Sequence, residues 1–143
     1  MSFDLKIKNG DLVIENGDIK TITDSEKLIQ DVLKICLTPV GFDKLNPWYG
    51  SFLSKSIIGS PESETLLNSI SKNQITKALE NLKDLQIYQI KSNQKMSADE
   101  QIASIKSVDV VRSQFDPRVY EIYITVITKG FKPITTAFRL STI

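Results

Sequence analysis

The last third of the chain carries the pattern that most constrains its fold, an alternation of side chains with a period of two residues. It runs through two stretches, in which one face is formed by Tyr120, Ile122, Ile124 and Val126 and then by Ile134, Thr136, Phe138 and Leu140. A period of two places alternate side chains on opposite faces of a β-strand, whereas a helix would scatter them around its axis. With residues 108–115 as a first strand and Asp116-Pro117 as its turn, the pattern predicts a three-stranded antiparallel sheet.

The N-terminal segment repeats one short phrase, Asn-Gly-Asp followed by Leu or Ile, at Asn9 and again at Asn16. Asn-Gly favours tight hairpin turns because both residues tolerate a positive φ angle. Stretches of β-forming residues flank each turn, so the segment predicts a small β-meander. Its strands are short, and we expect it to depend on the rest of the domain for stability.

A first helix is predicted to begin at Thr23, which has capping-box spacing to Glu26. Apolar residues then recur with helical spacing and form one broad stripe, made of Leu28, Ile29, Val32, Leu33, Ile35 and Cys36. Pro39 disfavours α geometry at Thr38 and ends the helix. Cys36 lies within the stripe, which favours a small buried hydrophobe over a reactive thiol.

The turn Asn46-Pro47-Trp48-Tyr49-Gly50 follows and carries the only tryptophan of the chain. Pro47 fixes φ, and two large aromatic side chains can pin a loop to the core. Aromatic residues are also typical of partner-binding corners. The sequence leaves both interpretations open.

A long helical region is predicted next, with Ser60 as its N-cap and Pro61 at its first position. It should run to about Lys95. The pattern over residues 85–90 also allows a short strand, and this alternative stays open.

Ser97 and Glu100 have the spacing of a second capping box, which predicts a short helix ending near Ile105. Together with the N-terminal meander and the C-terminal sheet, these central helices predict an α+β fold. A chain of 143 residues and 16.1 kDa suits one hydrophobic core. We therefore expect a single domain over residues 1–143.

Composition argues against several classes of function. The 18 Lys and Arg nearly cancel the 17 Asp and Glu, and the basic residues are scattered, so nucleic acid is not an expected partner. Histidine is absent, which removes the commonest general base and the commonest zinc nitrogen ligand. A single cysteine is typical of a protein made in a reducing cytoplasm. No apolar run is long enough to span a membrane, and no signal peptide is expected.

Few side chains could converge on a substrate. Acidic pairs occur at Glu62 and Glu64 and at Asp99 and Glu100, and a glycosidase needs two carboxylates. Both pairs fall at predicted helix starts, where acidic side chains meet the positive end of the helix dipole, so a structural role is favoured. The glycines form no phosphate-binding loop, and no calcium-loop spacing occurs. We expect no catalytic residue, no metal and no cofactor.

The last predicted strand has an outer edge that must be either covered or left open. An unpaired edge strand is a template for another chain, and proteins guard it with Lys, Pro, a bulge or a covering loop. Arg139 is the one guard among several β-forming residues here. From the residues alone, an edge covered within the fold is favoured over one left for a partner strand.

The order of these signals resembles the baseplate wedge family of contractile phage tails, typified by gene product 25 of the T-even phages. The distinctive stretch is residues 30–50, and the residues that carry the resemblance are Gln30, Thr38, Gly41, Asn46, Pro47, Trp48, Tyr49 and Gly50. The rest of the chain agrees mainly in shape, as helices followed by a β-meander.

The resemblance implies a structural protein and not an enzyme. Such proteins sit in the baseplate wedge with their helices bound to other baseplate wedge proteins, and the tail tube is a further candidate partner. Their C-terminal sheet offers strands to the tail sheath protein and so sets the first sheath ring in register. On this basis strand addition becomes the favoured use of the edge, and the implied sheath-binding residues are Ile134, Thr136, Ala137, Phe138, Arg139 and Leu140. The implied location is the virion, in the tail baseplate, and the host cytoplasm during assembly.

One family feature departs from its usual place. The family carries a Glu-Pro-Arg tripeptide ahead of its C-terminal strands, and the nearest equivalent here is Asp116-Pro117-Arg118. It falls between two predicted strands, so it is either a degenerate copy or only a turn. A bacterial tail-like particle would suit the same residues as a phage tail. Two other functions stay open, a peptidoglycan-cleaving tail hydrolase and a cytoplasmic adaptor that never enters a particle.

Overall fold

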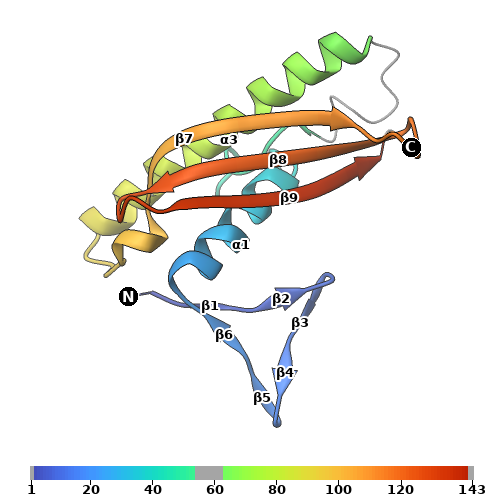
Figure 1. Ribbon diagram of the computed structural model, residues 1–143. Coiled ribbons are helices and arrows are strands. Elements are labelled where there is room, and N and C mark those ends of the chain that lie inside the picture. Colours follow the sequence, from blue (N-terminus) through green and yellow to red (C-terminus); the bar gives the residue numbers. More distant parts are fainter. Residues whose placement is uncertain (1, 54–62, 142–143) are drawn as a thin grey trace.

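The computed structural model of the protein describes residues 2–53 and 63–141 (Figure 1). In chain order its elements are β1 (Asp4–Leu5), β2 (Ile7–Lys8), β3 (Asp11–Leu12), β4 (Ile14–Glu15), β5 (Asp18–Ile19), β6 (Thr21–Ile22), α1 (Asp24–Leu37), α3 (Glu64–Lys91), the 3-10 turn η1 (Ala98–Glu100), β7 (Ile102–Arg112), β8 (Val119–Thr128) and β9 (Pro133–Ser141). The predicted α+β fold is confirmed: small N-terminal strands, helices in the middle, and a C-terminal antiparallel sheet.

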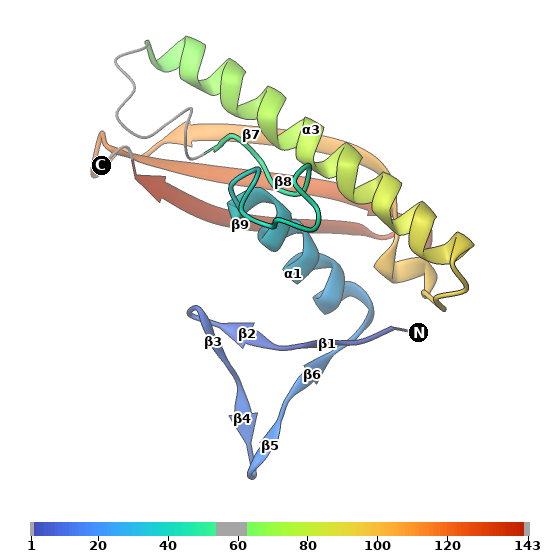
Figure 2. The ribbon, with the colours of Figure 1, turned by 180° about the vertical axis from the view of Figure 1, so that it is seen from behind.

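The C-terminal sheet has the order β7-β8-β9, with both neighbours antiparallel to the central strand. The predicted inward face of β8 is confirmed, because each of its members is at most 3% exposed: Tyr120, Ile122, Ile124 and Val126. Both helices cover this face. α3 lies against β7, and α1 lies beneath β9 (Figures 1 and 2).

Strand β7 both begins and ends earlier than the predicted residues 108–115, since it covers Ile102–Arg112. The short helix expected to end near Ile105 is wrong, since only the three residues of η1 are helical and β7 begins at Ile102. The capping interaction itself is present, because the Ser97 N–H donates to Glu100 Oε2 over 2.9 Å. Ile102 is 1% exposed and pairs with Thr128, so tertiary burial and ladder pairing end the turn at once.

Helix α1 ends where Pro39 predicts and begins after the predicted N-cap Thr23, but the predicted capping interaction is missing. The Thr23 side chain makes no cap hydrogen bond, so the predicted Thr23 capping box is wrong. Asp24 instead has a positive φ of 52° and accepts a 2.7 Å hydrogen bond from Ser97 Oγ. The contact with the distant η1 segment replaces the local cap.

The stripe predicted for α1 is narrower than expected. Leu28, Val32 and Ile35 are buried, and Cys36 is 2% exposed with the pKa of its thiol raised to about 12 by burial. This confirms Cys36 as a small buried hydrophobe. The remaining two members of the predicted stripe are only half-buried: Ile29 and Leu33.

Helix α3 is continuous, so the alternative of a strand within residues 85–90 is wrong. The side chain of its N-cap, Ser63, accepts from the Leu66 N–H, and the predicted start at Ser60 and Pro61 lies outside the described residues. The helix ends at Lys91 and not near Lys95. Within it, the buried Gln86 side chain donates to the Glu100 carbonyl and accepts from the Ile102 N–H, each over 2.9 Å, and so joins α3 to η1 and β7.

The six short N-terminal strands form a closed triangle that protrudes from the domain (Figure 1). The predicted turns are confirmed, with positive φ angles at Asn9-Gly10 and at Asn16-Gly17. Strand β1 pairs with β6, which closes the ring. Three residues that are seven positions apart, Lys6, Val13 and Lys20, are joined by a cycle of backbone hydrogen bonds. The Val13 N–H donates to Lys6 O, the Lys20 N–H to Val13 O and the Lys6 N–H to Lys20 O, over 2.9–3.0 Å. The segment is therefore three copies of a seven-residue unit.

Gln30 attaches this triangle to α1. Its Oε1 accepts from the Ile7 N–H over 3.0 Å, and its Nε2 donates to Leu5 O over 2.8 Å and to Asp4 Oδ2 over 3.0 Å. Lys34 forms an ion pair with the same Asp4 carboxylate. Partial burial acts to raise the pKa of Asp4, but these partners outweigh it and hold the pKa below its ordinary value. The family-motif residue Gln30 thus has a structural role.

The loop after α1 passes very close to the end of the helix at Gly50. A Cβ atom there would lie 2.3 Å from Thr38 O, and the residue has a φ of +118°. Gly41, in the same loop, also has a positive φ, but nothing lies within 4 Å of its hypothetical Cβ. Both positions therefore have a φ that would strain any other residue, and they differ in the space available for a side chain.

We predict that Gly50→Ala lowers the free energy of unfolding by about 3 kcal/mol or more, because positive φ and steric overlap act together. The matched control Gly41→Ala should lose only about 1–2 kcal/mol, from positive φ alone. Urea denaturation of the two variants and the wild type measures the difference. Equal losses would contradict the close approach at Thr38.

Candidate functional site

Strand β9 forms a regular edge of the sheet. Nine residue pairs join it to β8 without a register shift, from Val119↔Ser141 to Ile127↔Pro133. Within the described residues it pairs with β8 alone, so its other side has no strand beside it. From the residues alone an edge covered within the fold was favoured; over residues 2–53 and 63–141 no strand provides that cover.

Two backbone hydrogen bonds determine which groups of β9 point outward. The Thr128 N–H donates to Lys132 O over 3.0 Å, and the Ser113 N–H donates to Val119 O over 2.8 Å. In an antiparallel strand, the backbone groups of successive residues point alternately to one side of the strand and to the other. The two bonds agree on which residues of β9 point toward β8. The N–H and C=O groups that point away from β8 belong to alternate residues of β9, among them Thr135, Ala137 and Arg139.

The predicted sheath-binding residues divide between the two faces of this strand. Ile134, Thr136, Phe138 and Leu140 are half-buried, and three of them pack against the core. Ala137 and Arg139 lie on the exposed face. The structure therefore brings all six onto one strand. The apolar side chains face the helices, whereas the residues whose side chains lie on the exposed face are those whose backbone groups point away from β8.

Arg139, the predicted guard of the edge, is bound to the sheet itself. Its Nη2 lies 3.1 Å from Glu121 Oε1, and the Tyr123 hydroxyl donates to the other carboxylate oxygen over 2.9 Å. Glu121 is directly opposite Arg139 on β8. The guanidinium is thus held toward the central strand, which weakens the protection of the edge.

The opposite edge, on β7, has a different character. Its pairing with β8 shifts register twice, between Ile102 and Ser104 and between Ile105 and Ser107. Bulges of this kind bend a strand and are a usual protection against further pairing. Of the two edges, only β9 presents an uninterrupted ladder.

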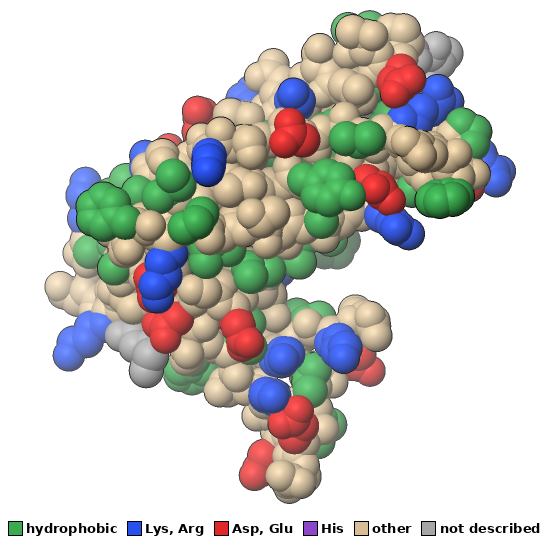
Figure 3. Space-filling view, in the orientation of Figure 1, with side chains coloured by type: hydrophobic (Ala, Val, Ile, Leu, Met, Phe, Trp, Pro, Cys, Tyr) green, Lys and Arg blue, Asp and Glu red, His purple; other side chains and the backbone are tan. Residues whose placement is uncertain are grey.

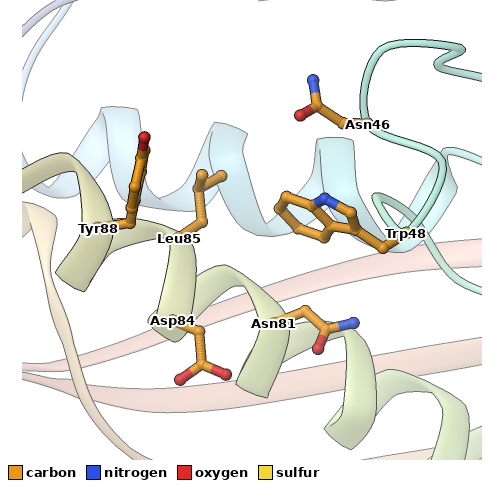
Figure 4. A pocket seen from close by; sticks show the side chains of 6 residues that line it. All are labelled: Asn46, Trp48, Asn81, Asp84, Leu85 and Tyr88. Atoms are coloured by element: carbon orange, nitrogen blue, oxygen red, sulfur yellow. The ribbon is translucent and has the colours of Figure 1, made fainter.

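A second surface lies between α3 and the turn at residues 46–49. It is a hollow of about 530 Å³ lined by Asn46, Trp48, Asn81, Asp84, Leu85 and Tyr88 (Figure 4). Leu85 lies between the rings of Trp48 and Tyr88. Asn46 lies on one side of this row, and Asn81 and Asp84 lie on the other. Trp48 is 44% exposed and Tyr88 is 67% exposed. The rings thus present apolar surface to solvent.

The family-motif residues of this turn form a hydrogen-bonded loop. The Gly41 N–H donates to Pro47 O over 3.1 Å, and the Tyr49 N–H donates to Asn46 O over 2.9 Å. Tyr49 packs against the core, which confirms the interpretation of a pinned loop. The neighbouring Trp48 ring meets Tyr49 edge-on and remains half exposed, so its role as a partner-binding corner stays a prediction.

The tripeptide Asp116-Pro117-Arg118 forms the turn between β7 and β8. The Arg118 N–H donates to Asp116 Oδ1 over 2.9 Å, and this bond contributes to lowering the pKa of Asp116 below its ordinary value. The Arg112 side chain donates to Pro117 O over 2.7 Å. These contacts are local to the turn, which lies at the end of the ladder where Val119 pairs with Ser141.

The acidic pairs do not form a catalytic arrangement among the described residues. Glu62 lies outside them, and Glu64 is in the first turn of α3, 3.6 Å from Arg112. Asp99 pairs with Lys132 over 2.9 Å. Glu100 is buried and accepts hydrogen bonds from the N–H groups of Ser2 and Ser97. Over residues 2–53 and 63–141 no group of acidic or cysteine side chains could hold a metal, and no helix is long and apolar enough to cross a membrane.

These features define the class of the protein: an α+β fold in which, among the described residues, β9 is a regular edge without a further strand, with a separate aromatic surface on the helical side. No protein-family model matches the sequence, and curated proteins yield no match to it either.

A crystal structure from Geobacter sulfurreducens, described as a candidate tail lysozyme, has a similar fold. The two chains superimpose with a TM-score of 0.61 at 13% sequence identity, over 82% of this chain and 90% of the other. At this identity the likeness concerns the fold, which is therefore one that occurs in a tail-related protein.

We predict that amide hydrogen exchange along β9 alternates. The N–H groups of Thr135, Ala137 and Arg139 should exchange at least about tenfold faster than those of Thr136 and Phe138, which bond to β8. Exchange followed by NMR on the isolated protein measures this. Uniform protection along the strand would mean that the edge is covered.

Proposed function

We propose that the protein is a structural component of the baseplate wedge of a contractile tail and templates the first ring of sheath by strand addition to β9. The observation that carries the proposal is the regular edge of β9, with its outward backbone groups and its guanidinium bound to Glu121. The resemblance of residues 30–50 to the wedge family and the tail-related fold support it. The protein acts in this proposal without any reactive side chain.

Strand addition suits the start of a polymer for a physical reason. Main-chain hydrogen bonds supply the affinity and fix the register of the incoming chain, because each outward N–H and C=O group pairs with one group of that chain. An edge without bulges accepts such a strand over its whole length. The first sheath chain would thus be held at one position along β9.

The aromatic hollow serves in this proposal as the docking face for other wedge proteins. Trp48 and Tyr88 flank it on the helical side of the sheet, and exposed rings of this kind are enriched in protein interfaces (Figures 2 and 4). It is formed by α3 and the 46–49 turn and not by β9, so both partners could bind at once. The protein would then reside in the tail baseplate of the virion, after assembly in the host cytoplasm.

Ala137→Pro tests the proposal because it removes one outward N–H while leaving the bonds to β8 in place. Proline is tolerated on edge strands where its missing donor faces solvent. Mixed with the sheath protein of the same tail, the variant should nucleate sheath at least about tenfold more slowly than the wild type, since it loses a main-chain bond and blocks close approach. Light scattering and electron microscopy follow the reaction.

Ala137→Thr is the matched control, since it changes the same exposed position and keeps the N–H group. It should nucleate sheath as the wild type does, and both variants should melt within a few degrees of it. Unchanged nucleation by a folded Ala137→Pro variant would contradict strand addition at this edge.

A cell-wall hydrolase is the second candidate function, favoured by the description of the structure from Geobacter sulfurreducens. The ion pairs of Glu64 and Asp99 and the hydrogen bonds of Glu100 give these carboxylates structural roles. We expect purified protein to release no soluble fragments from peptidoglycan. Release that is lost in a Glu64→Gln or Asp99→Asn variant would support the hydrolase instead.

A further inference from the structure

The hydrophobic core is incomplete beneath β9. The inward side chains of β8 are at most 3% exposed, but those of β9 that face the same layer are only half-buried. They include three large apolar residues: Ile134, Phe138 and Leu140. A strand beside β9 would bury the part of these side chains that now faces solvent.

Helix α1 carries apolar side chains on the flank that faces the same open side. Lys27 and Asp31 lie on one flank of the helix and, with Leu82 of α3, line a hollow between the two helices. Ile29 and Leu33, four residues apart on the opposite flank, are half-buried and point away from α3. Because α3 lies against β7 and α1 beneath β9, this flank faces the side of the sheet on which β9 is unpaired.

The N-terminal triangle bounds this space from below. A hollow of about 230 Å³ lies between the triangle and α1. Four of its lining residues are apolar, Ile7, Ile22, Ile29 and Leu33, and the other three are Lys6, Glu26 and Gln30. Ile7 is 45% exposed, although it belongs to the triangle's attachment to Gln30. Figure 3 shows the notch between the protruding segment and the body of the domain. We call the apolar side chains of Ile29 and Leu33 the floor of this notch, and they belong to the helix that contacts β9.

The other face of the sheet near the edge is polar. The Thr125 and Thr135 hydroxyls lie 3.0 Å apart, and Arg139 pairs with Glu121 on the same exposed face. An added strand would continue both faces, with side chains alternating between the apolar floor and this polar surface.

We propose that the segment received by β9 is an amphipathic strand of the partner chain, whose alternate apolar side chains pack over Ile29 and Leu33 and against Phe138. This inference rests on the proposed function and specifies the chemistry of the partner segment. Backbone hydrogen bonds form with any sequence, so in this proposal the apolar side chains of the floor determine which segment binds most tightly.

Synthetic peptides that tile the two terminal segments of the sheath subunit are the probe. Fluorescence anisotropy measures their binding to the wild-type protein. Two variants of the peptide that binds are then made. In the first, serine replaces the alternate residues that are apolar, and in the second, serine replaces the alternate residues of the other face. We expect only the first replacement to weaken binding, by about tenfold or more, since it removes buried apolar area.

Leu33→Gln tests the floor from the side of this protein. It should weaken binding of the unmodified peptide by about tenfold, because it places an amide against the apolar side chains of the strand. Ile87→Gln, at an exposed apolar position of α3, is the matched control and should bind as the wild type does. Thermal melting shows whether both variants fold, and Ile29→Gln is a second variant at the floor.

The outcomes separate the two proposals. The amphipathic-strand inference would be overturned, and strand addition left intact, if binding were lost with Ala137→Pro but unchanged with Leu33→Gln and Ile29→Gln. An equal loss of binding from both serine-substituted peptides would have the same meaning. If neither the peptides nor the whole sheath subunit bind the wild type, the proposed function fails and the inference fails with it. Self-association of the protein through β9, seen by sedimentation and abolished by Ala137→Pro, would make a second copy the occupant and overturn the inference.

Discussion

The buried face of the central strand β8 joins both helices to the C-terminal sheet. Its inward side chains, Ile122 and Ile124 above all, are inaccessible to solvent and hold both helices against the sheet. Its backbone pairs on both sides, and among the described residues β7 and β9 are the outer strands of the sheet. A three-stranded sheet must leave two edges, and the bulges of β7 make β9 the one suited to another chain.

Local rules predicted the elements whose cause is local. The alternation around β8 and β9 predicted both strands closely, because a half-buried strand imposes a period of two on its side chains. Pro39 ended α1 as expected. The start of β7 escaped prediction because its bulges break that period, and the Thr23 cap failed because Asp24 is held by the distant Ser97.

The strand that carries the candidate site was predictable, but the direction of its backbone groups was not. Ile134 and Phe138 were predicted on one face, whereas the outward direction of the Ala137 backbone depends on the phase of the ladder, which no sequence pattern records. Ile29 and Leu33 belong to the helical stripe in sequence, and only the position of α3 turns them toward the open side. The seven-residue repeat was visible as two Asn-Gly turns. Its third copy lacks them because the chain continues into α1 at Asp24.

In the proposed function, this protein lends hydrogen-bonding backbone to a foreign chain at β9. A cryo-electron microscopy reconstruction of the assembled tail, at a resolution that separates strands, would show whether it does. We expect a fourth strand, contributed by a subunit of the first sheath ring, paired along residues 135–139. A reconstruction in which that edge faces solvent, while the sheath contacts the protein elsewhere through side chains, would contradict it.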